Sequence, residues 1–404
     1  MSKTDISRIY FETLPRDIHL HLLLNSSCNG KCKFCTVKDI RPSLHLDDKL
    51  LYEYLLSLYP HVSYLIPTMG EVTIHKRNLE YLNYIHENYP QITLCMESNG
   101  IQFKDKWLEL YLNNRSLVKL SINAIKPDEY AMNVWSGKGG ETAFNKILKN
   151  IDAMINCLDD RYEILPPSLY FVITPQNVNS IEEYVRFCLE RKILCAGFYF
   201  ENFCYERYNN GALFSDLKMF AGISALFELK YILSGRLEIS FNLFRPYNVF
   251  QSLKEKTVYN TLKDPEYLKN RYRDLLDMVP PDHVASALSK HNRIRMAMGK
   301  SELSIHDISE FNCWDRLDKE DYSVCINPWK HILLGLSIDR ELEVRICPFI
   351  DNCYIKTKDI IRNGSIDWLS DVFNSDMYVN ARKNFLKGIY PQNCMYACPA
   401  SLNI

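Results

Sequence analysis

Six short apolar segments alternate with longer amphipathic segments through the first half of the chain. The short segments are rich in β-branched and aromatic residues and are bounded by turn residues, a pattern typical of buried strands. They are Ile18–Leu24, Val62–Thr68, Ile92–Glu97, Leu117–Ile122, Leu169–Thr174 and Leu194–Phe200. Helical periodicity fills the intervals at Asp47–Leu58, Asn78–Glu87, Lys104–Asn113, Thr142–Cys157 and Ile181–Lys192. Strands that alternate with helices predict an α/β fold with a parallel sheet.

The number of these strand–helix units distinguishes between barrel types. Six units are too few for the closed eight-unit barrel, so we expect a partial (β/α)6 TIM-like barrel over residues 1–204. Residues 205–310 show helical periodicity without further strands, which predicts a helical insertion or an ordinary connecting subdomain. Residues 311–404 then form a third region, in which cysteines are frequent.

Composition and charge exclude several classes of protein. The formal net charge of −1 offers no electrostatic reason to bind nucleic acid or an anionic membrane. No apolar run reaches the ~18 residues that a membrane span needs. The first residues lack the apolar core of a secretory signal, so we expect a cytoplasmic protein.

The 14 cysteines are unevenly distributed. Three lie between Cys28 and Cys35 and six between Cys313 and Cys398, while five are single. In the cytoplasm, where disulfides rarely persist, clustered cysteines indicate metal ligation. Single cysteines are usually core residues, which is what we expect for Cys95, Cys157, Cys188 and Cys195. Cys204, just after the sixth predicted strand, is also a candidate for radical quenching or proton transfer.

The segment Cys28-Asn-Gly-Lys-Cys32-Lys-Phe-Cys35 follows the first predicted strand. Three thiolates on one tight loop can ligate three irons of a [4Fe–4S] cluster, which normally takes four cysteines. The missing fourth ligand would leave one iron open to another molecule. A zinc site and simple core packing are the alternatives, but no second cysteine pair lies nearby in the sequence.

The spacing C-x3-C-x2-C, with Phe34 before the last cysteine, resembles the radical S-adenosylmethionine (SAM) superfamily. That resemblance implies that the methionyl group of SAM chelates the open iron, and that reductive cleavage of SAM releases a 5′-deoxyadenosyl radical. Phe34 matches the residue that borders the adenine. An external low-potential electron donor, of the flavodoxin or ferredoxin type, is also implied.

Other family motifs are matched at the ends of the following strands. Met69-Gly70-Glu71 is similar to the Gly-Gly-Glu motif that contacts the methionyl amino group, with Met69 in place of the first glycine. Ser98-Asn99 lies in a turn resembling the Thr-Asn-Gly turn, and Ser121 and Asn123 match polar positions at the ribose. Lys138 stands near the position of a family arginine that binds the methionyl carboxylate. Each motif alone also suits an ordinary turn at a strand end.

The C-terminal cysteines resemble the auxiliary-cluster domains called SPASM or, in shortened form, twitch. This resemblance implies a hairpin carrying the first two ligands and a loop after a helix carrying the last pair. The ligands of one auxiliary [4Fe–4S] cluster would be Cys325, Cys347, Cys394 and Cys398, with Cys313 and Cys353 as substitutes. Four cysteines suit structural zinc equally well, so zinc remains the alternative.

These resemblances predict a radical SAM oxidoreductase that removes a hydrogen atom from its substrate. Peptide or protein maturation by crosslinking, oxidation or epimerisation is the favoured substrate class. A dehydrogenase or epimerase acting on a sugar, aminocyclitol or other small molecule is the first alternative. A non-catalytic iron–sulfur or zinc protein is the second. We expect a peptide or small-molecule substrate, and neither nucleic acid nor a membrane as partner.

Overall fold

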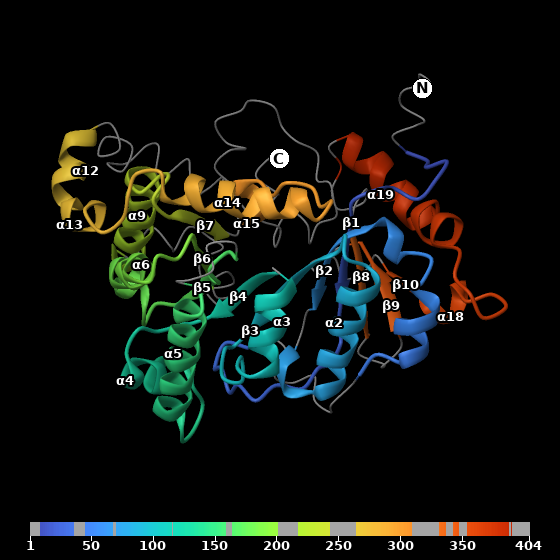
Figure 1. Cartoon of the computed structure of the whole chain (residues 1–404), viewed down its shortest axis with the longest axis horizontal. Helices are drawn as coiled ribbons and strands as arrows, with labels where there is room; N and C mark the ends of the chain where they lie inside the picture. Colours follow the sequence, from blue (N-terminus) through green and yellow to red (C-terminus); the bar gives the residue numbers. More distant parts are fainter. Residues whose placement is uncertain are drawn as a thin grey trace. The chain divides into compact units, whose positions relative to one another are not determined.

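A computed structural model describes residues 9–35, 45–67, 70–114, 116–158, 164–200, 217–242, 264–308, 331–336, 342–346, 354–387 and 389. The chain forms two compact units (Figure 1). The first comprises Met1–Cys28, Asp39–Glu97 and Lys319–Ile404, and the second comprises Asn29–Lys38 and Ser98–Asp318. The predicted division into residues 1–204, 205–310 and 311–404 stays a prediction.

The sheet of the first unit is formed by the strands β1 to β3 and β8 to β10. In sequence order these are β1 (Ile18–Leu22), β2 (Val62–Pro67), β3 (Thr93–Ser98), β8 (His331–Leu336), β9 (Leu342–Arg345) and β10 (Tyr354–Lys356). Their order in the sheet is β10-β9-β8-β1-β2-β3, with β8, β1, β2 and β3 parallel and the β8–β9–β10 pairs antiparallel. The C-terminal hairpin therefore extends the sheet that the N-terminal strands begin.

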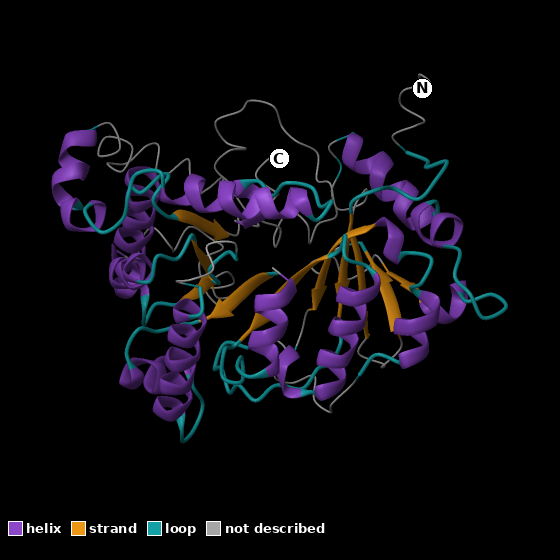
Figure 2. Ribbon diagram, in the orientation of Figure 1, coloured by secondary structure: helices purple, strands orange, loops and turns teal. Residues whose placement is uncertain are grey.

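Alternation of side chains along β1 explains how this sheet is buried. Ile18, Leu20 and Leu22 are fully buried, whereas His19 and His21 between them are half-buried. Successive strand residues point to opposite faces, so one face of β1 belongs to the apolar core and the other is polar. Helix α2 (Lys76–Asn88) lies along the strands in Figure 2 and buries Leu79, Leu82 and Ile85.

Short helices complete the first unit. They are the π-helix η1 (Leu50–Tyr54), the 3-10 helices η2 (Tyr59–His61) and η3 (Val72–Ile74), α18 (Thr357–Ile360), the π-helix η6 (Trp368–Phe373) and α19 (Asp376–Leu386). Asn374, just after η6, exchanges hydrogen bonds of 2.9 and 2.8 Å with the backbone of Phe11. These bonds tie the C-terminal helices to the N-terminal segment.

The second unit contains a sheet of four parallel strands in the order β4-β5-β6-β7. They are β4 (Leu117–Ser121), β5 (Ser168–Ile173), β6 (Cys195–Phe200) and β7 (Glu238–Asn242). One face is apolar, because Tyr184 of helix α6 (Ile181–Glu190) packs against Phe171 and Phe198, with ring centroids 4.6 and 5.4 Å apart. The register places Lys119, Ser168, Cys195 and Ser240 on the opposite, more polar face.

The helices of the second unit alternate with these strands and then follow them. They are α3 (Lys106–Asn114), α4 (Pro127–Glu129), the π-helix η4 (Tyr130–Val134), α5 (Gly140–Asn156), the 3-10 helix η5 (Val178–Ser180), α6 (Ile181–Glu190), α9 (Leu217–Ile232), α12 (Pro265–Arg271), α13 (Arg273–Leu276), α14 (His283–Ala297) and α15 (Ile305–Ile308). None of the helices in the described part of the chain has the length and apolar character of a membrane span.

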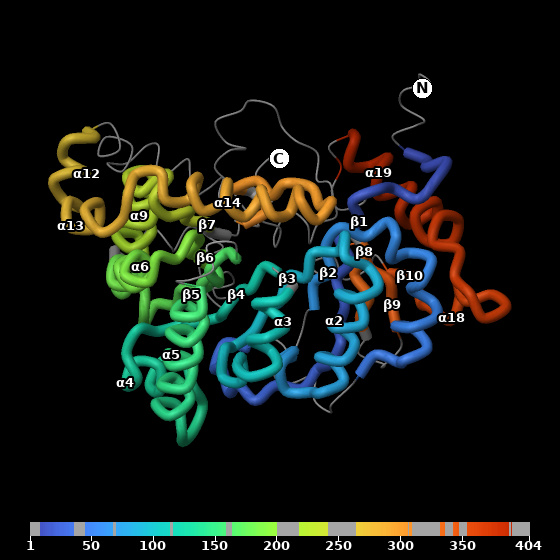
Figure 3. The backbone as a smooth tube through the Cα atoms, in the orientation of Figure 1, coloured from blue at the N-terminus to red at the C-terminus, as the bar shows by residue number. Residues whose placement is uncertain are grey.

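Parallel strands alternating with helices confirm the predicted α/β class with partial-barrel connectivity. One expectation was wrong: residues 205–310 contain a strand. β7 pairs in parallel with β6 (Figure 3), so α9 and β7 continue the strand–helix alternation. β7 has only five residues, Glu-Ile-Ser-Phe-Asn, and such a short alternating segment carries a weak strand signal.

Candidate cofactor site

The three cysteines of the N-terminal motif lie on the loop that follows β1. Cys28, Cys32 and Cys35 are each half-buried and in no disulfide. Cys28 belongs to the first unit, and Cys32 and Cys35 belong to the second. The Cys35 amide donates to the Cys32 carbonyl over 3.3 Å, which closes a tight turn between these two cysteines.

The donor set of this loop suits iron, since three reduced thiols can each supply one thiolate ligand. Among the described residues, however, no three His, Cys, Asp or Glu side chains converge as a metal site requires. Ligation by Cys28, Cys32 and Cys35 therefore stays a prediction. What the structure does contain is a set of contacts that fix the backbone on each side of the cysteines.

In the first unit, the Gly70–Glu71 turn after β2 contacts the backbone just before Cys28. The Glu71 amide donates to the Ser27 carbonyl over 2.7 Å, and the Asn25 side chain donates to the Glu71 carbonyl over 3.3 Å. Gly70 has a φ of +63°, and a Cβ there would lie 2.5 Å from the Ser27 carbonyl oxygen. Only glycine allows this left-handed conformation and this close approach together.

The Glu71 side chain also orders the start of the next helix. It is 1% exposed, and its Oε1 accepts hydrogen bonds from the Thr73 amide (3.1 Å) and the Thr73 hydroxyl (2.6 Å). Glu71 thus caps η3, a local role typical of a carboxylate at a helix N-terminus. The structure places Gly70 and Glu71 beside the backbone before Cys28, whereas Met69 lies outside the described residues, and their contact with SAM stays a prediction.

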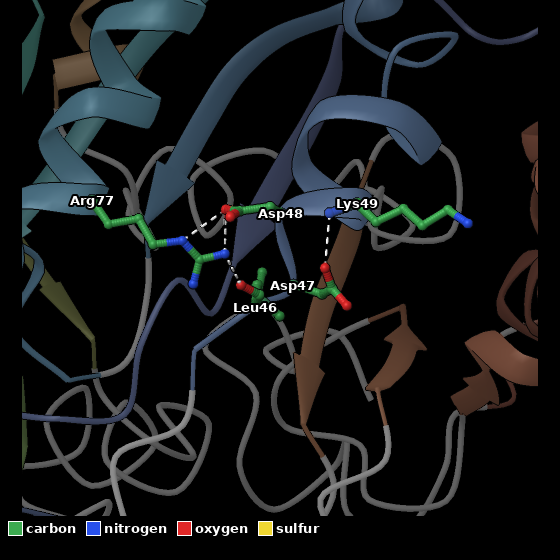
Figure 4. A network of polar contacts seen from close by, with 5 residues as sticks. All are labelled: Leu46, Asp47, Asp48, Lys49 and Arg77. Atoms are coloured by element: carbon green, nitrogen blue, oxygen red, sulfur yellow. Dashed lines mark hydrogen bonds and ion pairs between the residues drawn. The ribbon is translucent and has the colours of Figure 1, made fainter.

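The segment that begins at His45 lies beside the residues that directly follow β1. His45 forms an antiparallel bridge with Asn25, and the Leu46 amide donates to the Leu24 carbonyl over 3.2 Å. Arg77 at the start of α2 donates through Nη2 to the Leu46 carbonyl (2.6 Å) and through Nε to Asp48 (2.8 Å) (Figure 4). Exposed ion pairs contribute little free energy, so Arg77 mainly fixes the position of this segment.

In the second unit, the turn after β3 holds the backbone just after Cys28. The Asn99 side chain donates to Asn29 Oδ1 over 2.7 Å and accepts from the Ile101 amide over 3.0 Å. The Ser98 hydroxyl, which is buried, accepts from the Gly100 amide over 3.0 Å. The predicted residues Ser98 and Asn99 therefore lie at the loop, with Asn29 as the direct contact.

A second contact in this unit comes from Val134–Ser136, which we call the strap. The Lys33 amide donates to the Val134 carbonyl over 2.8 Å, and the Ser136 amide donates to the Lys31 carbonyl over 2.7 Å. Cys32 and Trp135 are thereby directly opposite residues of a short antiparallel bridge. The backbone of Lys31–Lys33 is thus held in an extended conformation by the segment that follows η4.

The predicted ribose-contacting residues lie at the carboxyl end of β4 and differ in exposure. Ser121 is exposed, whereas Asn123 is 3% exposed and its Oδ1 accepts from the Val172 amide over 2.8 Å. Asn177, 1% exposed, donates to the Val172 carbonyl (2.9 Å) and accepts from the Thr174 amide (2.7 Å). Asn123 and Asn177 therefore satisfy backbone groups at the strand ends, and only Ser121 is openly accessible.

Two further predicted cofactor residues are exposed to different degrees. Phe34 is half-buried on the loop. Lys138 is exposed, and its carbonyl accepts from the Trp135 indole over 3.2 Å, so its backbone is attached to the strap.

The remaining predicted cysteines lie outside the described residues, namely Cys204, Cys313, Cys325, Cys347, Cys353, Cys394 and Cys398. The hairpin expected between Cys325 and Cys347 is present as β8 and β9.

Sequence reasoning missed Asn25, Asn29 and the strap. Asn25 and Asn29 flank the cysteine motif, and an Asn just after a strand signals a side chain that bonds nearby backbone. That signal was available but unspecific. The partner of Cys32, Trp135, stands 103 positions later in a segment without strand periodicity, so no local pattern indicates the pairing.

Comparison with known proteins matches these features to one family. Residues 23–188 match the family model described as the radical SAM superfamily. A 152-residue segment is 24% identical to a GTP 3′,8-cyclase of Clostridium perfringens (strain SM101 / Type A), covering 36% of this chain and 44% of the cyclase. A 122-residue segment is 26% identical to the FeMo cofactor biosynthesis protein NifB of Methanocaldococcus infernus, covering 27% and 40%. Each match spans less than half of the relative.

Among solved structures, Streptococcus suis SuiB bound to its precursor peptide SuiA is similar with a TM-score of 0.52. It is 13% identical, and the similarity covers 96% of this chain and 71% of SuiB. At this identity the likeness shows a shared fold.

The parallel α/β fold and the cysteine loop after its first strand define a cofactor-binding domain of the partial-barrel class. Residues 23–188 form a domain of the radical SAM superfamily type. Such a domain implies a [4Fe–4S] cluster and bound SAM. The chemistry of three thiols suits such a cluster, and their convergence on it stays a prediction.

Proposed function

We propose that Cys28, Cys32 and Cys35 bind a [4Fe–4S] cluster with one open iron that binds SAM. The pair supplies a 5′-deoxyadenosyl radical, with which the enzyme removes a hydrogen atom from its substrate. The observation that carries this proposal is the backbone support on both sides of Cys28. The Gly70–Glu71 turn bonds Ser27 before it, and Asn99 bonds Asn29 after it.

The protein's own residues would position the reactants and exclude water. The rigid backbone around the thiols fixes where a cluster is held, because its neighbours are bonded to the ends of β2 and β3. Phe34, Gly70, Glu71, Ser121, Asn123 and Lys138 are the remaining proposed SAM contacts, together with Met69. Of these, Glu71 and Asn123 already accept internal hydrogen bonds, so their contribution would come mainly through neighbouring backbone groups.

Replacement of Cys32 by Ala tests this function. Anaerobically reconstituted wild-type protein should contain iron and sulfide and should form 5′-deoxyadenosine from SAM with dithionite. The Cys32→Ala protein should form none, because a cluster with two protein ligands is not retained. If cofactor cleavage persisted at the wild-type rate in Cys32→Ala, the proposal would be wrong.

Peptide or protein maturation is the substrate class that we favour. SuiB, whose structure contains a precursor peptide, shares its fold with nearly the whole of this chain. The sequence relatives support a different candidate, since the GTP cyclase acts on a small molecule by its name. The rate of 5′-deoxyadenosine formation should therefore be measured without substrate, with candidate peptides and with candidate sugars. Stimulation by peptides alone supports maturation, and stimulation by sugars alone supports the small-molecule dehydrogenase or epimerase.

We further propose that Cys325, Cys347, Cys394 and Cys398 bind an auxiliary [4Fe–4S] cluster, and that a flavodoxin or ferredoxin in the cytoplasm supplies electrons. The hairpin of β8 and β9, between the first two of these cysteines, supports the SPASM or twitch resemblance. A variant with Cys28, Cys32 and Cys35 all replaced by Ala should still bind about four irons with sulfide. Zinc without sulfide in this variant would favour the structural alternative.

A further inference from the structure

In the second unit the cysteine loop is held by the Asn99 turn and by the strap, and both of these pack against helix α5. Asn150 of α5 donates to the Gly100 carbonyl (2.8 Å) and the Ile101 carbonyl (3.1 Å), so it fixes the turn that carries Asn99. Ile147, one turn earlier, packs against Gly100, where a Cβ would lie 3.2 Å from its methyl group. Asn99 is therefore held by α5 while it bonds Asn29 on the loop.

The strap is attached to the same helix through buried aromatic side chains. Trp135 is 6% exposed and lies 5.9 Å from the Tyr130 ring, which in turn lies 5.2 Å from Phe144 of α5. Gly140 allows this close packing, because a Cβ there would lie 2.7 Å from Ala131 Cα and 3.0 Å from Trp135 Cβ. Val134 and Trp135 of the strap are thus buried against the unit, whereas Ser136 is exposed.

The geometry of the bridge determines what the strap can do to the loop. The bonds at Lys33 and Ser136 flank Cys32 and Trp135, which form a non-hydrogen-bonded antiparallel pair. In such a pair the Cα atoms are about 4.5 Å apart and the side chains lie on one side. The strap therefore fixes both the conformation of Lys31–Lys33 and the direction in which the Cys32 side chain projects.

We propose that Trp135 and Ser136 are positioning residues that order the cysteine loop before any cluster binds. Ser136 acts through its amide and Trp135 through packing on Tyr130, and neither needs to touch the cluster. Ordering Lys31–Lys33 in advance removes part of the conformational entropy that cluster binding would otherwise lose. This inference rests on the proposed function of the cysteine loop, and its test includes a measurement on the protein without a cluster.

Replacement of Ser136 by Pro, with Ser136→Ala as the matched control, separates the amide from the side chain. Proline lacks the N–H that bonds Lys31, whereas alanine retains it. The preceding residue tolerates proline, because Trp135 has φ −90° and ψ 141°. A third variant, Trp135→Leu, removes the indole but leaves both main-chain bonds available.

Hydrogen exchange on the cluster-free proteins is the first measurement. We expect the Lys33 amide to be protected in wild type and in Ser136→Ala, and to exchange roughly tenfold faster or more in Ser136→Pro. Protection within α5 should be equal in all three, which shows that the unit is folded. Trp135→Leu should give an intermediate rate, and it replaces Ser136→Pro if that variant does not fold.

Iron release to a chelator from the reconstituted proteins is the second measurement. We expect release roughly tenfold faster from Ser136→Pro than from Ser136→Ala. Equal exchange at Lys33 and equal iron release in these two variants would overturn the role of the strap. If wild type itself bound no iron, the proposed function would fail, and hydrogen exchange alone would decide whether the strap orders the loop.

Discussion

Cysteines lie in two contrasting environments, the loop after β1 and the buried strands and helices that we call the wall. Cys28, Cys32 and Cys35 are half-buried on a loop, and the backbone on both sides of Cys28 is bonded to strand-end turns. Cys95, Cys188 and Cys195 are 3%, 0% and 0% exposed within β3, α6 and β6. In the loop the protein orders the backbone and leaves the thiols accessible. In the strands and in α6 the protein buries the thiols, and the Cys195 sulfur lies 3.9 Å from the Ser240 hydroxyl.

The buried cysteines also differ from an ordinary thiol in their pKa. Burial, followed by the nearby Glu238, raises the pKa of the Cys195 thiol to about 12, and burial also raises the pKa of Cys188 well above its usual range. A raised pKa keeps these thiols protonated at neutral pH, and a protonated thiol is a poor nucleophile and metal ligand. Burial therefore separates Cys95, Cys188 and Cys195 from the candidate ligands. Cys157 was also expected in the core, and that expectation was wrong, because Cys157 is exposed just after α5.

The largest difference is expected in iron content, when one cysteine of the loop and one of the wall are each replaced by alanine. Cys35→Ala should lose essentially all the iron of the N-terminal cluster, because only two protein ligands remain. Cys188→Ala should retain it and lower the free energy of unfolding by about 1–2 kcal/mol. Iron analysis and denaturant melts measure both effects. Equal iron contents would contradict the distinction between the regions.

Alkylation of the cluster-free native protein sharpens the contrast. At pH 9 a thiol of pKa about 12 is thiolate in only about one molecule in a thousand, and burial also shields it from the reagent. Iodoacetamide should label the half-buried Cys28, Cys32 and Cys35 and the exposed Cys157 within minutes and leave the buried Cys188 and Cys195 unmodified. Because their pKa values are raised, this protection should weaken only at higher pH. Peptide mass spectrometry follows each site, and guanidinium unfolding should make all of them reactive.

A smaller effect is expected at the turn that supports the loop from the first unit. Gly70→Ala should weaken SAM binding about tenfold, because the new Cβ would lie 2.5 Å from the Ser27 carbonyl oxygen. Gly139→Ala is the matched control, since Gly139 also has a positive φ but nothing lies within 4 Å of its Cβ position. Anaerobic calorimetry compares the two. Equal affinities would mean that the Gly70 contact does not shape the site.

The smallest effect is expected at Asn99. Asn99→Ala removes the hydrogen bond to Asn29 and should destabilise the loop by about 1 kcal/mol, or roughly fivefold in cluster retention. Asn99→Asp keeps an acceptor for the Ile101 amide but cannot donate to Asn29. Iron retention under chelation should therefore be reduced in both variants. Wild-type retention in Asn99→Asp would show that the bond to Asn29 is unimportant.

Much of the fold could be predicted from local sequence patterns. The six predicted strands correspond to β1–β6, because each lies in an apolar segment bounded by turn residues. The sequence of β7 is less apolar than those of the other strands, since Glu238 and Ser240 make the face that it shares with Cys195 polar. Its pattern therefore did not indicate a buried strand. The pairing of β8 with β1 also carries no local signal, because it joins residues more than 300 positions apart.

For the site, family motifs singled out Gly70 and Asn99, and the structure shows both beside the cysteine loop, while their contact with the cofactor stays a prediction. The strap could not be foreseen. Its bonds join main-chain atoms of Lys31, Lys33, Val134 and Ser136, and main-chain pairing depends on topology rather than on side-chain identity. The sequence also did not indicate a second role for Asn123, whose side chain accepts from the Val172 amide while its expected contact with the cofactor stays a prediction.

Electron paramagnetic resonance of the reduced protein, with and without SAM, tests the central claim most directly. The Cys325, Cys347, Cys394 and Cys398 codons should be changed to alanine so that only the N-terminal cluster contributes. Three protein ligands leave one iron open, so addition of SAM should change the spectrum of the reduced [4Fe–4S] cluster. An unchanged spectrum from a fully loaded cluster, or a protein holding zinc without sulfide, would contradict the account.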